Sequence, residues 1–287
     1  MILVDCNSIC HTCKHSMGDL SFEEKKVGVI FGFLRQILTL AKLLDTNEFV
    51  FAWDSRSSNR IKMFPDYKKA RRREKSPEEE ELDSLAYAQF DKLRKEILPS
   101  IGFLNNFMQE GFEADDIIAS VIHNNTAEKI SIISTDEDLY QLLSEQVDMY
   151  SIKKKQFYTV YNLWKDFRIT PAEWIEVKAI AGCSTDGLSG VPGVGEKTAC
   201  KYLNRVLNPL HKTYRSIKEN SELIERNRGL VQLPLVGTLR YPIRINEHLS
   251  LGNFIDICNE HGFMSFLGQD TLSKWKEHLF HGKMRKL

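Results

Sequence analysis

Short, nearly continuous apolar runs alternate with stretches of helical periodicity in the first part of the chain. ILVD and FVFAWD end on Asp5 and Asp54, and ISIIS is a third run of the same kind. Runs of this length between polar residues predict buried strands. Between Phe22 and Leu44, apolar residues recur at intervals of three and four, which predicts an amphipathic helix. The alternation predicts an α/β fold with a mostly parallel sheet and helices on both faces.

Further elements follow the same alternation. Ser76-Pro77-Glu78-Glu79 has the form of a capping box with proline in the first turn, so we expect a helix from Pro77 to Leu98. Phe103–Phe107 is a further candidate strand, GFEADDIIASVIHN opens a helix, and TDEDLYQLL turns into a helix directly after ISIIS. VDMYSI and QFYTVY predict a closing hairpin or paired edge strands.

The pattern changes near residue 165. ITPAEWIEVKAIAG and GEKTACKYLNRVL have helical periodicity and flank a glycine-rich turn. The rest of the chain is mainly helical, except for Gly229–Arg244, where we predict no element. We therefore expect an α/β domain over residues 1–165 and a helical region over residues 166–287.

Charge is balanced in number but uneven in position. Lys+Arg and Asp+Glu each number 39, and the formal net charge of +0 argues against a uniformly basic nucleic-acid binder. Basic residues crowd into Lys68–Lys75 and the tail HGKMRKL, and acids into Glu78–Glu81. A chain that binds a polyanion with basic patches and cations with acidic clusters also sums to zero. Since no apolar run could span a bilayer and no signal peptide is evident, we expect a cytoplasmic protein of a bacterial or phage-infected cell, without membrane contact.

Three of the six cysteines stand close together in DCNSICHTCKH. Cys10 and Cys13 have the spacing of half a zinc site, and His11 and His15 are near. No second CxxC or HxxxH half follows to complete such a site, so we favour reduced, partly buried thiols.

Carboxylates gather where the predicted strands end. The carboxyl ends of parallel strands share one edge of a sheet, where α/β proteins bind their ligands. Ionised carboxylates crowded there need divalent cations to neutralise them, and all-oxygen ligands suit Mg²⁺ or Mn²⁺. Two such ions would serve phosphodiester hydrolysis. The alternative is that these acids are helix caps and turn residues, a role that suits Asp116. The acids concerned are Asp5, Asp54, Glu113, Asp115, Asp116, Asp136 and Asp138.

Several segments together resemble the signature blocks of the structure-specific 5′-nucleases, in family order over residues 1–205. This family includes bacteriophage flap endonucleases and 5′–3′ exonucleases and the N-terminal nuclease domain of bacterial DNA polymerase I. The resemblance implies a PIN-like fold with a helical arch over residues 62–100 and a helix–three-turn–helix over residues 171–206, and the length is similar to that of a stand-alone enzyme. The matching blocks are ILVDCN, FAWD, FPDYKKAR, EADD, STDEDLYQLL and AGCSTDGLSGVPGVGEKTA.

The resemblance also implies roles for the acids. Asp138 and Asp186 would hold a second ion. Mg²⁺ is the expected cofactor, with Mn²⁺ able to replace it, and a K⁺ ion held by backbone carbonyls is implied at the helix–three-turn–helix. The first metal site and its surroundings would consist of Asp5, Asp54, Glu113, Asp115, Asp116 and Asp136.

Further residues match the family's DNA contacts. Lys68 and Arg71 match basic arch residues that contact the scissile phosphate, so with Asp5 and Asp54 they are the expected catalytic residues. Tyr67 matches an aromatic position that stacks on an end base, with simple packing as the alternative. The glycine-rich turn permits close backbone approach to a phosphate at the start of the next helix, although a plain connection between helices is the alternative. The residues expected to contact DNA are Tyr67, Lys69, Arg72, Arg73, Gly190, Gly193, Val194, Gly195, Lys197 and Lys201.

Two positions depart from the family pattern. Cys183 stands where the family has the first aspartate of its second metal site, and Cys6 replaces a glycine. A thiol is a poor ligand for Mg²⁺, so we expect the second site to be weakened. Redox sensitivity or a softer metal is an alternative.

These observations predict a monomeric, metal-dependent 5′-nuclease that hydrolyses phosphodiesters near junctions of single and double strands. Its expected partners are DNA with 5′ flaps or ends and RNA–DNA hybrids, in replication or primer removal. Two alternatives remain open: a branched-DNA-binding paralogue with weak or no catalysis because of Cys183, and a PIN-type ribonuclease.

Overall fold

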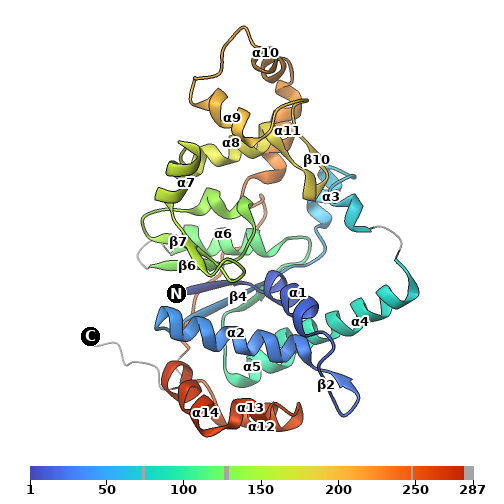
Figure 1. The fold of residues 1–287 in the computed structure, drawn as a ribbon, viewed down its shortest axis with the longest axis vertical. Helices are drawn as coiled ribbons and strands as arrows, with labels where there is room; N and C mark the ends of the chain where they lie inside the picture. Colours follow the sequence, from blue (N-terminus) through green and yellow to red (C-terminus); the bar gives the residue numbers. More distant parts are fainter. Residues whose placement is uncertain (73–74, 126–128, 247, 281–287) are drawn as a thin grey trace. The chain divides into compact units, whose positions relative to one another are not determined.

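The molecule has an α/β fold built on one mostly parallel sheet. The computed structural model describes residues 1–72, 75–125, 129–246 and 248–280. The sheet has six strands in the order β5-β4-β1-β6-β7-β8 (Figure 1), which confirms the predicted class. The strands are β1 (Ile2–Asp5), β4 (Phe49–Trp53), β5 (Asn106–Met108), β6 (Ile130–Ile133), β7 (Val147–Ser151) and β8 (Gln156–Tyr158).

The chain divides into two compact units that differ from the predicted division near residue 165. Each unit contains separate stretches of the chain. The first consists of Met1–Trp53, Lys75–Phe107 and Pro242–Leu287, and the second of Asp54–Glu74 and Met108–Tyr241.

In the first unit, β1 pairs in parallel with β4, and Asp5 lies opposite Ala52. The chain leaves β1 directly into α1 (Cys6–Met17), a helix that the sequence patterns did not predict. Asp5 caps α1 by accepting a hydrogen bond of 3.0 Å from the backbone N–H of Ser8. The acid at the end of this strand is therefore also the start of a helix.

The cysteines of α1 face its neighbour α2 (Gly28–Leu44). Cys6, Cys10 and Cys13 are buried, and a Cβ on Gly32 of α2 would lie 2.6 Å from the sulfur of Cys13. Burial raises the pKa of the Cys13 thiol to about 12. All six cysteines are buried and free, as the packing interpretation expects.

The long helices of the first unit differ in their ends from the prediction. α2 begins at Gly28 rather than near Phe22, because Glu23 and Glu24 have φ of 47° and 65° and form a turn between the short strands β2 (Ser21–Phe22) and β3 (Lys25–Lys26). α4 (Pro77–Lys92) starts with the predicted capping box of Ser76 and Glu79. It continues through a π-helical turn, η2 (Leu93–Ile97), into α5 (Leu98–Ile101).

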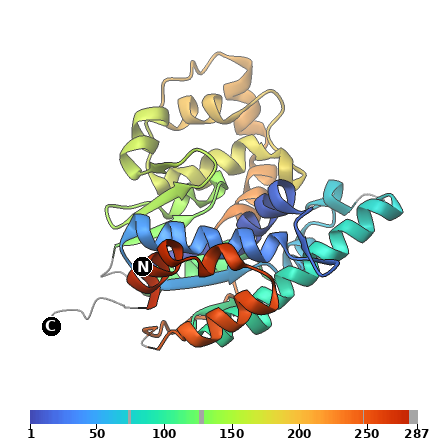
Figure 2. The same ribbon diagram turned by 60° about the horizontal axis from the view of Figure 1, so that its bottom comes forward.

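The C-terminal helices belong to the same unit. Figure 2 shows them beside α2, which η5 contacts. The predicted strand at Phe103–Phe107 is shifted to β5, because Phe103 is instead buried edge-on against the rings of Phe49 and Phe51. The C-terminal elements are α12 (Leu251–Glu260), α13 (Met264–Leu267), α14 (Gln269–Trp275) and the π-helical η5 (Lys276–Phe280).

In the second unit, β6 and β7 are parallel and β8 returns antiparallel to β7, which confirms the predicted hairpin. TDEDLYQLL forms a 3₁₀ helix, η3 (Glu137–Leu142), rather than an α-helix. No regular element lies between α11 and Arg244 in the described chain. The other elements of this unit are α3 (Ser58–Met63), η1 (Lys69–Arg72), α6 (Ala114–Asn124), α7 (Val160–Phe167), α8 (Pro171–Ala181), β9 (Gly182–Cys183), η4 (Ser184–Asp186), β10 (Leu188–Ser189), α9 (Glu196–Leu203), α10 (Lys212–Glu219) and α11 (Ser221–Val231).

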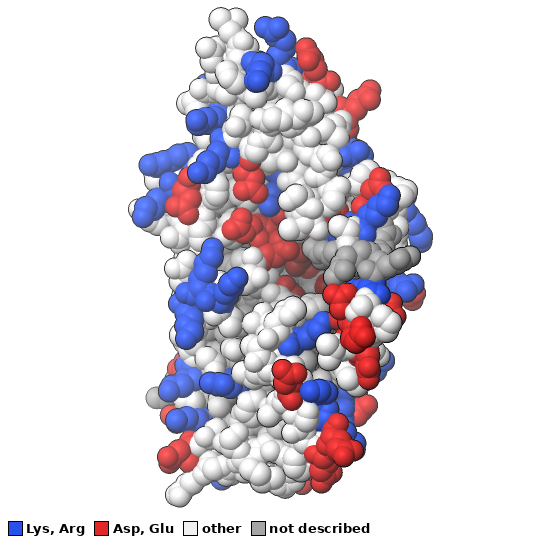
Figure 3. Space-filling view, turned by 45° about the vertical axis from the view of Figure 1, so that its right-hand side comes forward, with Lys and Arg blue, Asp and Glu red and all other residues white. Residues whose placement is uncertain are grey.

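On the surface drawn in Figure 3, acidic side chains gather near the centre of the view, and many basic side chains lie along its left edge. Among the described residues, none of the helices is both long enough and apolar enough to cross a bilayer.

Candidate metal and DNA site

Most of the predicted acids lie in the second unit, at the starts of helices. Glu113 is the N-cap of α6, and Asp115 and Asp116 are in its first turn. Asp136 is the N-cap of η3, with Asp138 in its first turn. Asp54 follows β4 and accepts a hydrogen bond of 2.7 Å from the backbone N–H of Ala114, which brings it to the start of α6. The positions agree with the sequence prediction, because short polar side chains end strands and cap helices.

Glu113 is held by several side chains. Its carboxylate accepts hydrogen bonds from Ser57 Oγ at 2.7 Å and Tyr67 OH at 2.9 Å, and from the ammonium group of Lys68. Burial opposes its ionisation, but the positive charges of Lys68 and Arg60 outweigh burial and lower the pKa of Glu113 to about 2. Glu113 is therefore a permanently ionised group at neutral pH.

Asp116 has a structural role rather than the predicted metal-binding one. Its carboxylate is fully buried and forms two hydrogen bonds, of 2.6 and 2.8 Å, with the guanidinium group of Arg60. It also accepts from the backbone N–H groups of Glu113 and Leu235. These four bonds occupy its oxygen lone pairs, so it is not available to an ion.

Tyr67 agrees with the packing alternative of its prediction. The side chain is 3% exposed and packs with Cys183, Leu188, Leu230 and Val231. Its hydroxyl group contacts Glu113 and, at 3.1 Å, Asp186 Oδ2. A ring buried in this cluster has no free face for a base, so Tyr67 here links the two acids instead of stacking on DNA.

Lys68 is held tightly next to the same acids. Its backbone has φ of 52°, and its N–H donates to the carbonyl oxygen of Asp186 at 2.7 Å. Its ammonium group contacts Glu113 and lies 3.8 Å from Asp186 Oδ1. Gly187 must be glycine here, because its φ is 72° and a Cβ would lie 2.9 Å from the carbonyl oxygen of Asp66. Lys68, just before η1, is thus fixed against the loop Cys183–Asp186.

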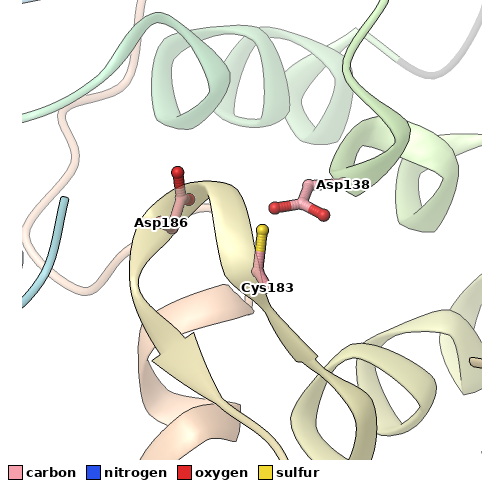
Figure 4. A group of neighbouring side chains, drawn as sticks. All are labelled: Asp138, Cys183 and Asp186. Atoms are coloured by element: carbon pink, nitrogen blue, oxygen red, sulfur yellow. The ribbon is translucent and has the colours of Figure 1, made fainter. Parts of the chain in front are cut away.

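Asp138, Cys183 and Asp186 form a compact group of candidate metal ligands (Figure 4). One oxygen or sulfur atom from each lies within 4.8 Å of the other two. Asp138 comes from η3, whereas Cys183 and Asp186 come from β9 and η4, and the Asp138 carboxylate points toward the Cys183 sulfur. Cys183 Sγ lies 3.0 Å from the hydroxyl oxygen of Thr185.

Lys178 is a functional neighbour that the sequence reasoning missed. It is 7% exposed, and its Nζ lies 2.9 Å from Asp138 Oδ1 and 3.0 Å from Glu196 Oε1. Burial opposes its charge, but Asp138 and Glu196 outweigh burial and raise its pKa. A lysine inside the apolar run WIEVKAIA was the available signal, since a buried lysine requires an anionic partner.

Arg60 is the second residue that was missed. It is 2% exposed, and besides Asp116 it donates to the carbonyl oxygen of Leu230 at 3.0 Å. Nothing in the polar segment SSNRIKM marks this arginine as buried.

The donor set fits divalent cations. The pKa of Asp136 is raised to about 6, first by the loss of water around its carboxyl group and then by the negative charge of Asp138. Oδ1 of Asp138 is buried, and no donor among the described residues is aligned with it for a hydrogen bond, although Lys178 is near. A bound cation would reduce the repulsion between these carboxylates and would be coordinated by the free lone pair.

Among the residues that it describes, the structure does not bring several other predicted ones into this group. Asp5 lies in the first unit, where it caps α1. The side chains of Arg71 and Arg72 and the whole of Arg73 lie outside the described residues, and Lys69 is exposed with its ammonium 3.0 Å from Asp66.

The glycine-rich turn has two different kinds of glycine. Gly182 and Gly190 pack face to face, because a Cβ on Gly190 would lie 2.1 Å from the carbonyl oxygen of Ala181 and one on Gly182 would lie 2.3 Å from the N of Gly190. By contrast, a Cβ on Gly193 or Gly195 would meet no described atom within 4 Å. Gly190 thus shapes the loop, and the surface beside Gly193 and Gly195 is open.

The neighbouring residues complete this surface. Lys197 and Lys201 are exposed one turn apart on α9, as a phosphate-binding face requires. Val194 does not suit the predicted contact, because its side chain is 5% exposed and its N–H donates to the carbonyl oxygen of Val191.

An α/β fold with such a carboxylate group, next to an ion-paired lysine, indicates an α/β protein that binds divalent metal ions. Residues 1–168 match the family described as "5′-3′ exonuclease, N-terminal resolvase-like domain". The 5′-3′ exonuclease of Buchnera aphidicola subsp. Schizaphis graminum is 31% identical over 211 residues, which cover 72% of this chain and 70% of that protein. The chain belongs to this 5′-3′ exonuclease family.

Solved structures share the fold. A structure of T5 5′-exonuclease with bound divalent metal ions (zinc) has a TM-score of 0.69 and 21% identity, with 98% of each chain covered. A complex of bacteriophage T5 flap endonuclease with DNA and metal ions has a TM-score of 0.68 and 21% identity, and covers 98% of this chain and 97% of that one.

Proposed function

We propose that this protein is a structure-specific 5′-nuclease that cuts phosphodiesters near junctions of single- and double-stranded DNA, as flap endonuclease and 5′–3′ exonuclease. The observation that carries the proposal is the contact between Lys68 and the acids: its ammonium group lies between Glu113 and Asp186, next to the Asp138–Cys183–Asp186 group. A cation beside a group of metal ligands suits a substrate that carries negative charge.

Bound divalent cations would supply the Lewis-acid chemistry of phosphodiester hydrolysis. We assign the first ion to Asp54, Glu113, Asp115 and Asp136, and the second to Asp138 and Asp186. All-oxygen donors favour Mg²⁺, with Mn²⁺ as a substitute.

The chain's own residues would position the substrate. Lys68, held by its backbone to Asp186, offers a fixed positive charge to the scissile phosphate as negative charge develops on it. Tyr67 and Arg60 hold Glu113 in place from the buried side. Arg71 is assigned to the same phosphate from its place in the sequence.

The turn before α9 would bind the duplex through its phosphates. The open surface at Gly193 and Gly195 admits a phosphate to the backbone, and Lys197 and Lys201 extend the contact along α9. Such contacts position a duplex without reading its sequence. A K⁺ ion at this turn, a monomeric state, action on RNA–DNA hybrids and a cytoplasmic location are further parts of the proposal.

A substrate with a labelled 5′ flap tests the proposal. We expect cleavage near the junction in Mg²⁺ or Mn²⁺, and its loss in Lys68→Ala but not in Lys165→Ala, a matched change of an exposed lysine on α7. Product from single-stranded RNA only would support a PIN-type ribonuclease instead.

A second candidate is a protein that binds branched DNA without cutting it. Two features favour this candidate, because each weakens the binding of a second Mg²⁺ ion. They are Cys183 in place of a carboxylate and the ion pair between Lys178 and Asp138. Tight flap binding without product in either metal would establish this candidate and exclude the nuclease.

A further inference from the structure

Cys183 brings a soft sulfur donor into a group that otherwise consists of carboxylates. We propose that it makes this second site selective for thiophilic divalent cations such as Zn²⁺, Cd²⁺ and Co²⁺, bound by Asp138, Cys183 and Asp186. The inference rests on the proposed function in so far as it takes this group as a metal site, and it names the class of metal that the site prefers.

The geometry suits an ion without large movement. The three donor atoms lie within 4.8 Å of one another, and the Asp138 carboxylate faces the sulfur (Figure 4). Cys183 is fixed by its pairing with Leu188 and by the close contact of Gly182 with Gly190. Cys183 is 8% exposed, so its side chain is held by packing before an ion binds.

The donor set differs from that of a magnesium site. Mg²⁺ prefers hard oxygen ligands, whereas thiolate sulfur favours zinc and other soft ions. Three protein ligands and one position left for water or substrate form the usual arrangement of catalytic zinc sites. Thr185, whose hydroxyl oxygen is 3.0 Å from the sulfur, can donate a hydrogen bond to the thiolate once an ion has displaced its proton.

Lys178 strengthens this selectivity. Its ammonium group lies 2.9 Å from Asp138 Oδ1, so it repels any cation that approaches Asp138. Mg²⁺ binds by electrostatic attraction alone and has no compensating interaction at this site. An ion that forms a bond to sulfur does have one, because metal–thiolate bonding adds to the charge attraction.

Absorption spectroscopy of the full chain tests the proposal directly. Cd²⁺ or Co²⁺ is titrated into metal-free protein, and the ultraviolet band of sulfur-to-metal charge transfer is recorded. We expect this band in the wild type and its loss in Cys183→Ser. Cys200→Ser, which removes another buried free thiol of the same unit on α9, should keep the band.

The acids of the group provide a second readout. Asp186→Asn removes a proposed ligand, so it should keep a band but weaken Cd²⁺ binding by more than the roughly 10- to 100-fold that follows loss of a residue beside a metal ligand. A wild type without the band, or a band that survives unchanged in Cys183→Ser, would overturn the inference.

Flap cleavage by the same preparations separates this inference from the proposed function. Cleavage in Mg²⁺ without a thiolate band would leave the nuclease proposal standing and refute the thiophilic site. A band without cleavage in any metal would support the thiophilic site and refute the nuclease proposal.

Discussion

Arg60 and Asp116 form a buried ion pair in the second unit, with exposures of 2% and 0%. Each oxygen of Asp116 accepts from the guanidinium group, and the same carboxylate accepts from the backbone at Glu113 and Leu235. The pair therefore joins the start of α6 to the segment after α11. Its role is to hold Glu113 in place rather than to bind an ion.

Replacing Arg60 should destabilise the protein strongly. Arg60→Met leaves the buried carboxylate of Asp116 without its oppositely charged partner, which costs about 3–5 kcal/mol. Lys69→Ala breaks the exposed pair with Asp66 and should cost at most about 1 kcal/mol. Urea unfolding of both variants measures the difference, and equal losses of stability would contradict the assignment.

Asp136 should make the metal-free protein less stable as pH rises. Its pKa of about 6 in the folded chain exceeds the unfolded value of about 3.9, so folding favours the protonated form. The free energy of unfolding should then fall as pH rises from about 4 through about 6, because the folded state releases a proton that the unfolded state has already lost.

Asp136→Asn removes this effect. We expect the metal-free variant to melt at a higher temperature than the wild type at pH 7 and at the same temperature at pH 4. It should also lose flap cleavage, since the group is a proposed metal ligand. A lower melting temperature than the wild type at pH 7 would show that Asp136 stabilises the fold.

The sequence located where these acids lie in the fold, but not the side chains that pair with them. Asp54, Glu113 and Asp136 stand at strand ends and helix starts, which local pattern can locate. Lys178 and Arg60 are paired by contacts across distant parts of the chain, and a cation's burial depends on those contacts rather than on its neighbours in sequence.

The turn between α8 and α9 has a tightly packed part at Gly182 and Gly190 and an open part at Gly193 and Gly195. Gly182 and Gly190 hold β9 and β10 together, and thereby place Cys183 and Asp186. Gly195, the N-cap of α9, leaves open space for a partner. One short segment thus serves both the proposed metal site and the proposed duplex contact.

Two alanine variants separate these roles. Gly190→Ala places a Cβ about 2 Å from the backbone of Ala181, so it should lower the melting temperature and abolish cleavage. Gly195→Ala meets nothing in the protein and should cost at most about 1 kcal/mol as a changed N-cap. It should instead weaken duplex affinity, measured by fluorescence anisotropy, while the cleavage rate at saturating substrate is kept. Equal melting temperatures for the two variants would contradict this division.

The elements themselves were predicted where local signals are strong. The capping box located the start of α4, and alternation located the β7–β8 hairpin. α1 was missed even though its cysteines were expected to be buried, because the contact of Cys13 with Gly32 is a property of packing. η3 was expected as an α-helix, because the choice between 3₁₀ and α geometry in one or two turns depends on contacts that periodicity does not report.

At the scale of the whole molecule, the family blocks run along the chain in order, but the fold does not follow that order. The sheet order β5-β4-β1-β6-β7-β8 places β1 between strands that come much later, and crossover connections rather than sequence neighbours set such an order. Each compact unit likewise contains separate stretches of the chain, so a single boundary near residue 165 does not describe them.

In the proposed function, this chain is a metal-dependent nuclease whose second metal site is limited by Cys183. The Mg²⁺ dependence of flap cleavage by the wild type and by Cys183→Asp tests it most directly, because the added carboxylate would complete the group with Asp138 and Asp186. We predict that Cys183→Asp reaches half of its maximal rate at a lower Mg²⁺ concentration than the wild type. A variant that cleaves less than the wild type at every Mg²⁺ concentration would contradict the account.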